Sequence, residues 1–141
     1  MVPVNYLAVV ASMVVMMVLG YVWYGPLFGK KWSHLMGWSD DAVREMQSKG
    51  NMGKSYGIMA VGALVMAFVL AHSLIFASAY LHESGISAGL QTGFWNWLGF
   101  VVPLTLGPVL WEGKSWKLWM LNAGYYLVGL LLMGVLLALW V

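Results

Sequence analysis

The sequence contains no cysteine, and this absence excludes several kinds of chemistry. Without thiols the chain forms no disulfide, no thiolate metal site and no iron–sulfur cluster, and it carries out no thiol redox reaction. Charge is also scarce, because Asp, Glu, Lys and Arg make up 9% of the residues, whereas a soluble domain carries about 25%. No basic tract is long enough to bind nucleic acid, so we expect no nucleic-acid partner.

Apolar residues are abundant: they make up 62% of the chain and form four runs that contain no charged residue. The runs cover residues 4–27, 56–81, 89–110 and 118–141. Each is close to or above the ~20 residues that cross a bilayer as a helix. In lipid, such a run satisfies its backbone hydrogen bonds within itself only if it is helical. The sequence therefore predicts one all-α integral membrane domain over residues 1–141, with four transmembrane helices.

The Lys and Arg residues fall in only two of the three loops between these runs, and the second loop has none. They are Lys30, Lys31, Arg44, Lys49, Lys54, Lys114 and Lys117. Loops rich in Lys and Arg stay in the cytoplasm. We therefore expect a multi-pass protein of the bacterial cytoplasmic (inner) membrane, with both basic loops inside and both termini outside.

The long polar loop, residues 29–53, has the signature of a short helix. Ser39 suits the N-cap, Asp40 and Asp41 suit the first turn, and Gly50 suits the stop. We expect this helix to lie at the cytoplasmic membrane surface, and we favour a solvated connector over a docking site for a partner.

Two similar stretches stand at the inner ends of the first and third runs. Residues 25–32 read "GPLFGKKW", and residues 107–116 read "GPVLWEGKSW". In each, Gly-Pro is expected to end or kink the helix, Lys to meet the headgroups and Trp to anchor the interface. The four helices would then form two hairpins in the same orientation, as a parallel repeat. Convergence on common interface residues is the alternative, and the sequence leaves both open.

These stretches also carry a resemblance. "WYGPLFGKKW" after an N-terminal apolar run, a later "WNWLGF", and "WEGK" before the last run are similar to a family of small bacterial membrane proteins catalogued as domain of unknown function 1761. The resemblance covers nearly the whole chain. It implies a four-helix integral membrane protein, and it implies no activity.

Polar and aromatic side chains within or beside the runs are the candidate binding residues, because polar groups in a membrane are expensive and often functional. They are Trp23, His72, Asn96, Glu112 and Asn122. For His72 we favour a neutral ring bonded to a neighbouring helix over a proton relay, solute ligand or metal ligand. For Glu112 we favour a carboxylate paired with a nearby lysine over a catalytic base.

Small residues recur every three or four positions in the third run. Gly85, Gly89 and Gly99 fall on one stripe with Thr92 and Asn96. Such a stripe lets another helix approach closely, with Asn96 as an interhelical hydrogen-bonding group. We expect this face to be buried against helices of the same chain.

Nothing in the sequence supplies a nucleophile–base pair or a cluster of metal ligands, so we expect no catalytic residue, no metal, no cofactor and no enzymatic activity. The favoured function is a structural, interaction or lipid-associated module, with membrane lipid and either further copies of the chain or another membrane protein as partners. The alternative is an oligomeric channel or transporter for a small solute or ion. A continuous polar cavity reaching both His72 and Asn96 would favour transport, and a dry bundle would favour the module.

Overall fold

A computed structural model describes residues 1–48 and 52–140, and over these residues the chain is helical without any strand. Four helical segments in the described residues are long and apolar enough to cross a membrane, which confirms the prediction of an all-helical chain with four candidate spans. These spans are Tyr6–Leu27, Met52–Leu81, Gly85–Trp111 and Trp116–Leu139. The first comprises α1 (Tyr6–Val22) and the π-helix η1 (Trp23–Leu27). The second is α4 (Met52–Leu81) and the fourth is α8 (Trp116–Leu139).

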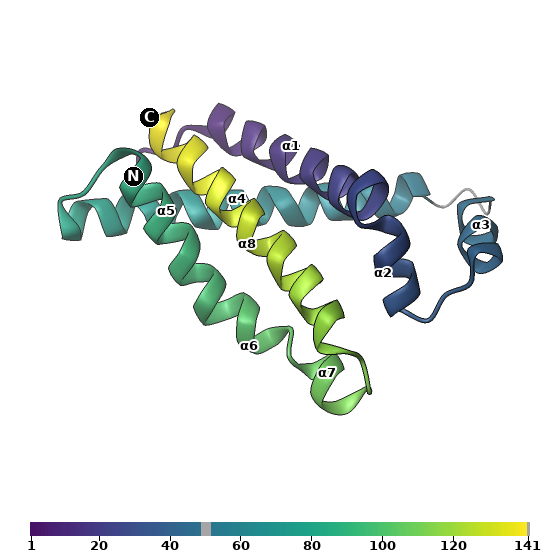
Figure 1. Cartoon of the computed structure of the whole chain (residues 1–141). Coiled ribbons are helices and arrows are strands. Elements are labelled where there is room, and N and C mark those ends of the chain that lie inside the picture. Colours follow the sequence, from purple (N-terminus) through teal and green to yellow (C-terminus); the bar gives the residue numbers. More distant parts are fainter. Residues whose placement is uncertain (49–51, 141) are drawn as a thin grey trace.

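The third span is the least regular, because it is divided into four pieces. It comprises α5 (Gly85–Asn96), the π-helix η2 (Trp97–Val101), α6 (Val102–Leu104) and α7 (Gly107–Trp111). A π-helix bonds each N–H to the carbonyl five residues back, where an α-helix reaches back four, so η2 widens one turn. The pieces give this span its bends (Figure 1).

The helices pack in an order that places α8 at the centre of the bundle. In Figure 1, α8 crosses α4 and runs beside α5, and α1 lies along α4. α1 also contacts α8. The buried core is made of Ala, Val, Leu and Met side chains from α1, α4, α5 and α8, with Tyr125 as its aromatic member.

Both termini lie at one end of the bundle, beside the connection between α4 and α5 (Figure 1). Asn5 connects the N-terminal and C-terminal segments at this end through hydrogen bonds. Its Oδ1 accepts hydrogen bonds from the backbone N–H groups of Leu7 and Ala8, which caps α1. Its Nδ2 donates to the carbonyl of Trp140, 3.2 Å away.

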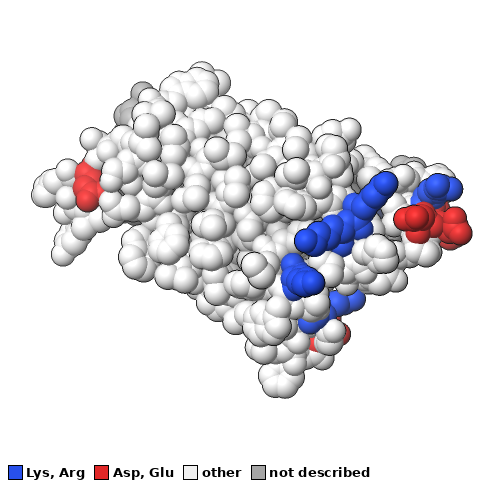
Figure 2. All heavy atoms as spheres, in the orientation of Figure 1, with Lys and Arg blue, Asp and Glu red and all other residues white. Residues whose placement is uncertain are grey.

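The opposite end carries α2 (Gly29–Leu35), α3 (Asp40–Ser48) and the connection from α7 to α8. Figure 2 shows Lys and Arg side chains gathered at this end, while the α4–α5 end shows one acidic patch and no basic one on the visible face. The basic loops predicted to share one side therefore do meet in the fold.

The polar loop does form the short helix that its sequence predicts, over Asp40–Ser48. Ser39 Oγ accepts a hydrogen bond from the N–H of Ala42 at 3.1 Å, as expected of an N-cap. Gly50, the predicted stop, lies outside the described residues.

The two similar Gly-Pro stretches differ in local structure. Gly25 and Pro26 lie inside η1, where Gly25 departs from helical geometry (φ −108°, ψ −106°) and the chain kinks before α2. Gly107 and Pro108 instead open α7, with Pro in the first turn, where its missing N–H is harmless. The two similar sequences therefore have different structural roles: Gly25-Pro26 breaks a helix, and Gly107-Pro108 begins one.

Candidate functional site

The kink at the end of α1 turns two aromatic side chains toward α8. Tyr24 donates its phenolic hydrogen to Asn122 Oδ1 over 2.7 Å. Trp23 Nε1 donates to the carbonyl of Leu121 over 3.1 Å. The structure therefore brings together Trp23 and Asn122, two of the five candidate residues, although they lie 99 positions apart in the sequence.

A second indole donor reaches the same stretch of α8 from the third span. Trp97 Nε1 donates to the carbonyl of Ala123 over 2.8 Å. A backbone carbonyl has two lone pairs, so it can accept a side-chain donor as well as its own helical N–H. The Trp23 ring also packs against Gly124, where a Cβ would be in ordinary contact with the ring at 3.4 Å. The residues around Asn122 are thus held from two sides.

Further aromatic rings close around the kink, and we call this set the kink cluster: Trp23, Tyr24, Phe28, Trp32, Tyr125 and Tyr126. The rings of Tyr24 and Tyr125 meet edge to face, with centroids 5.2 Å apart. Tyr125 donates its hydroxyl hydrogen to the carbonyl of Met16 at 3.2 Å. Edge-to-face pairs add about 0.5–1.5 kcal/mol beyond the area they bury.

Three hydrogen-bond donors of the kink cluster are directed at acceptors of the same chain. The hydroxyls of Tyr24 and Tyr125 and the indole of Trp23 each donate to an atom of another span. No base is placed to activate either hydroxyl as a nucleophile, since the acceptors are an amide oxygen and a backbone carbonyl. The arrangement can lock the kink of the first span onto α8.

His72 lies away from this cluster and makes a local hydrogen bond. Its Nδ1 is 2.8 Å from the carbonyl of Phe68, one turn back on α4. Since a carbonyl only accepts, Nδ1 carries the hydrogen and Nε2 is the acceptor of the neutral ring. The ring also packs on Phe68, with centroids 4.4 Å apart. The expected bond to a neighbouring helix is therefore replaced by one within α4.

Asn96 also bonds within its own helix. Its Nδ2 donates to the carbonyl of Thr92 over 2.8 Å, so the expected interhelical hydrogen bond is not the one that forms. The side chain lines a crevice between α4 and α5. His72 does not line this crevice, so the two candidates share no cavity there.

Glu112 is exposed at the end of α7. Among the described residues, no lysine lies close enough to form the expected ion pair with it, and Lys114 instead points its Nζ at the carbonyl of Met36, 3.5 Å away. Within the same residues, no group of three or more His, Asp or Glu side chains could hold a metal ion.

The small-residue stripe is in close contact over only part of its length. A Cβ on Gly89 would lie 2.6 Å from the carbonyl carbon of Gly134 and 2.9 Å from the N of Val135. By contrast, no atom lies within 4 Å of the position that a Cβ would take on Gly85 or Gly99. Gly85 instead adopts a positive φ of 68°, which suits the turn into α5.

Gly93 is the packing residue that the sequence reading missed. A Cβ there would meet the Leu130 carbonyl at 2.6 Å, so the backbones of α5 and α8 also touch one turn further along. The signal was present, because residues 85, 89 and 93 form two overlapping G-x-x-x-G patterns. The partner glycine, Gly134, lies in a run of large aliphatic residues and carries no such pattern.

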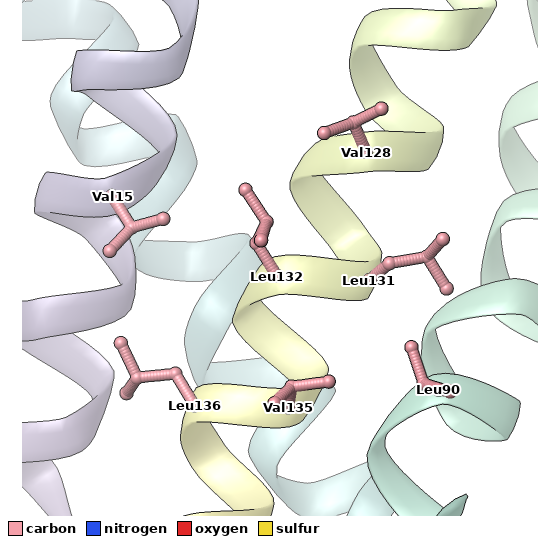
Figure 3. Close-up of a pocket in the computed structure, with 7 residues that line it drawn as sticks. All are labelled: Val15, Leu90, Val128, Leu131, Leu132, Val135 and Leu136. Carbon is pink, nitrogen blue, oxygen red and sulfur yellow. The ribbon is translucent and has the colours of Figure 1, made fainter. Parts of the chain in front are cut away.

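A wholly aliphatic groove lies along α8. Its volume is about 410 Å³, and in Figure 3 Val15 of α1 and Leu90 of α5 flank a row of α8 side chains. That row is Val128, Leu131, Leu132, Val135 and Leu136. No polar side chain lines this groove.

Comparison with known proteins places the chain in a family. Residues 7–138 match the family model described as "Protein of unknown function (DUF1761)". No curated protein and no solved structure matches the chain.

Proposed function

The chain belongs to the DUF1761 family, for which no function is known, and we propose from the geometry that it is a structural, lipid-associated module of the membrane. The observation that carries this proposal is the direct backbone contact between α5 and α8 at Gly89 and Gly134. Two helices that touch at their backbones leave no room for a solute to pass between them. The contact supports a closely packed bundle with no passage between α5 and α8.

The kink cluster supports the same proposal. Its donors connect the first span to α8 and are directed at acceptors inside the chain. Interhelical hydrogen bonds average about 0.6 kcal/mol in membranes, so several together are needed to hold a kink in place. Residues that the sequence offered as ligand-binding candidates, Trp23 and Asn122, are here used to fix helix positions.

The aliphatic groove on α8 supplies the lipid association, and we assign it to a lipid acyl chain. The groove faces the hydrocarbon region of the bilayer, where acyl chains are the surrounding solvent. Its lining is Val and Leu without Gly, Ala or Ser. Membrane helices dock through small residues that let backbones approach, so this lining suits a flexible chain better than a helix.

The orientation and topology belong to the same proposal. The basic end faces the cytoplasm of a bacterium, both termini lie outside, and α3 rests at the inner interface, following the bias of Lys and Arg. The spans form two hairpins, the first with the second and the third with the fourth. Oligomers or a second membrane protein would cover exposed aromatic side chains of the third span, such as Phe100.

The transport alternative finds less support in this geometry. The crevice that reaches Asn96 does not include His72. The groove on α8 offers only aliphatic side chains, which give an ion or polar solute nothing to replace its hydration.

Photolabelling of the protein in lipid nanodiscs tests the lipid assignment. The nanodiscs contain a phospholipid with a diazirine in its acyl chain, and adducts are mapped by peptide mass spectrometry. We expect adducts to concentrate on residues 128–136 relative to the exposed side chains of residues 58–69 on α4. Val128→Phe should fill the groove and lower this labelling several-fold, whereas Val65→Phe, on an exposed face of α4, should not. Equal labelling of both stretches, or no effect of Val128→Phe, would refute the assignment.

A further inference from the structure

We propose that the crevice between α4 and α5 is a binding site for a small organic ammonium ion. It lies near the end of the bundle that carries the α4–α5 connection, and its volume is about 140 Å³. Glu83, in that connection, lines it together with Trp95 and Asn96 of α5 and Ser73 and Ser78 of α4. This proposal is independent of the lipid groove, which lies on α8.

The amide donors of Gln91 and Asn96 already have acceptors within the chain, and their amide oxygens stay free. Gln91 points its Nε2 at Glu83 Oε2 and at Ser87 Oγ, so both amide hydrogens have acceptors. Asn96 Nδ2 donates to the Thr92 carbonyl. The oxygens of the two amides therefore remain as acceptors beside the carboxylate. A ligand that matches this lining must bring donors.

The charge at this end favours a cation. Glu83 has no ion pair among the described residues, and every Lys and Arg of the chain lies in the basic loops or at their edges. His82, next to it, is exposed and does not line the crevice. The indole of Trp95 is 63% exposed, and its ring face attracts an ammonium group. An anion would meet a carboxylate and no basic partner.

The remaining walls exclude a bare metal ion and limit the size of the ligand. Ala77, Leu81 and Ala88 line the crevice and offer only hydrocarbon. A hard cation such as Ca²⁺ takes six to eight oxygen ligands, usually with several carboxylates among them, whereas this crevice has a single carboxylate. Drug-sized ligands occupy about 300–1,000 Å³, so this crevice suits an ammonium group with a short hydrocarbon chain.

Thermal unfolding of the full chain in nanodiscs tests the proposal, with propylammonium chloride as the probe. We expect propylammonium to raise the melting temperature in a saturable manner. Propan-1-ol, sodium propionate and potassium chloride, at matched concentration and ionic strength, should not. Glu83→Gln keeps the size of the side chain and removes its charge, so we expect the apparent affinity to fall about tenfold or more.

Matched variants separate a specific site from a general effect of charge or folding. Glu112→Gln removes a carboxylate at the other end of the bundle and should leave the propylammonium response unchanged. Asn96→Leu removes one acceptor without altering the charge and should also weaken the response. The proposal is overturned if Glu83→Gln and Glu112→Gln respond like the wild type, or if potassium chloride gives the same shift as propylammonium. The lipid groove and this crevice are separate sites, so failure of the lipid photolabelling experiment would not change the expected response to propylammonium.

Discussion

Replacing Gly89 by alanine should separate α5 from α8 and destabilise the bundle. The added methyl group would meet the carbonyl carbon of Gly134 at 2.6 Å and the N of Val135 at 2.9 Å. Ordinary contacts at a Cβ begin at 3.4 Å. Because these atoms belong to the backbone, and the carbonyl oxygen of Gly134 lies nearer still, no side chain can rotate away and relief requires the helices to move apart by roughly 1 Å.

Moving α5 and α8 apart weakens the packing between them. A gap of 0.5–1 Å forfeits about a quarter to a half of the dispersion energy of each atom pair that it opens. Added bulk in a packed interior typically costs about 1–3 kcal/mol. Alanine favours a helix over glycine by roughly 1 kcal/mol in water, but a separated span stays helical in lipid. We therefore expect Gly89→Ala to lower the free energy of unfolding by about 2 kcal/mol, and Gly89→Leu to lower it further.

Unfolding by SDS, followed by circular dichroism in mixed micelles, measures this difference. Gly62→Ala is the matched control, because Gly62 also lies within a spanning helix and a Cβ there meets nothing within 4 Å. The control records any gain in helix propensity alone. If Gly89→Ala unfolds at the same SDS fraction as Gly62→Ala, the backbone contact does not hold α5 to α8 and the reasoning fails.

Three further outcomes follow from the same geometry. Tyr24→Phe removes the hydrogen bond to Asn122 and should lower the free energy of unfolding in SDS by about 0.6–1.7 kcal/mol. If the variant is as stable as the wild type, this hydrogen bond does not hold the kink and packing alone does. Gly99→Leu should unfold within about 0.5 kcal/mol of the wild type, because nothing lies near that position, and a loss as large as that of Gly89→Leu would contradict this. Gln47→Cys should react with an impermeant thiol reagent only after cells are permeabilised, and labelling of intact cells would reverse the proposed orientation.

The four spans could be predicted because their signal is simple. Length, absence of charge and the distribution of Lys and Arg are read directly from the chain, and the helices follow from the need to satisfy the backbone in lipid. The N-cap at Ser39 was equally readable, since the capping side chain and its N–H partner are three residues apart. Local rules therefore carried the prediction of individual elements.

Gly99 shows why the packing face could not be followed along the whole third span. The predicted stripe assumed an unbroken α-helix, in which each residue turns by about 100°. The π-helix η2 begins at Trp97, and its turn contains about one more residue than an α-helical turn. The residues that follow are therefore rotated about the helix axis, away from the face that an unbroken α-helix would give them. Gly89 and Gly93 precede this turn and pack on α8. Gly99 lies within the turn, and the position that a Cβ would take there contacts no neighbouring helix among the described residues.

The kink cluster depends on contacts that no local pattern records. Trp23 and Tyr24 reach Leu121 and Asn122 across 98 residues, so their partners follow only from the packing of α1 on α8. For Asn96 the reverse holds, because the Thr92 carbonyl one turn back is always within reach and competes with any partner on another helix. Polarity identified these residues as candidates, and packing decided what each of them does.

The reactivity of a cysteine at position 12 tests the dry, closed bundle most directly. Ser12 is fully buried and its Oγ has no hydrogen-bond partner, so Ser12→Cys changes little in size and sits inside the packed core. The chain contains no other cysteine. In proteoliposomes we expect Ser12→Cys to stay unmodified by a water-soluble methanethiosulfonate reagent added on both sides, and to react once SDS unfolds it. Ser87→Cys, at an exposed position of α5, should react readily in the folded protein. If Ser12→Cys reacts in the folded protein as fast as Ser87→Cys, water reaches the core and the closed bundle is contradicted.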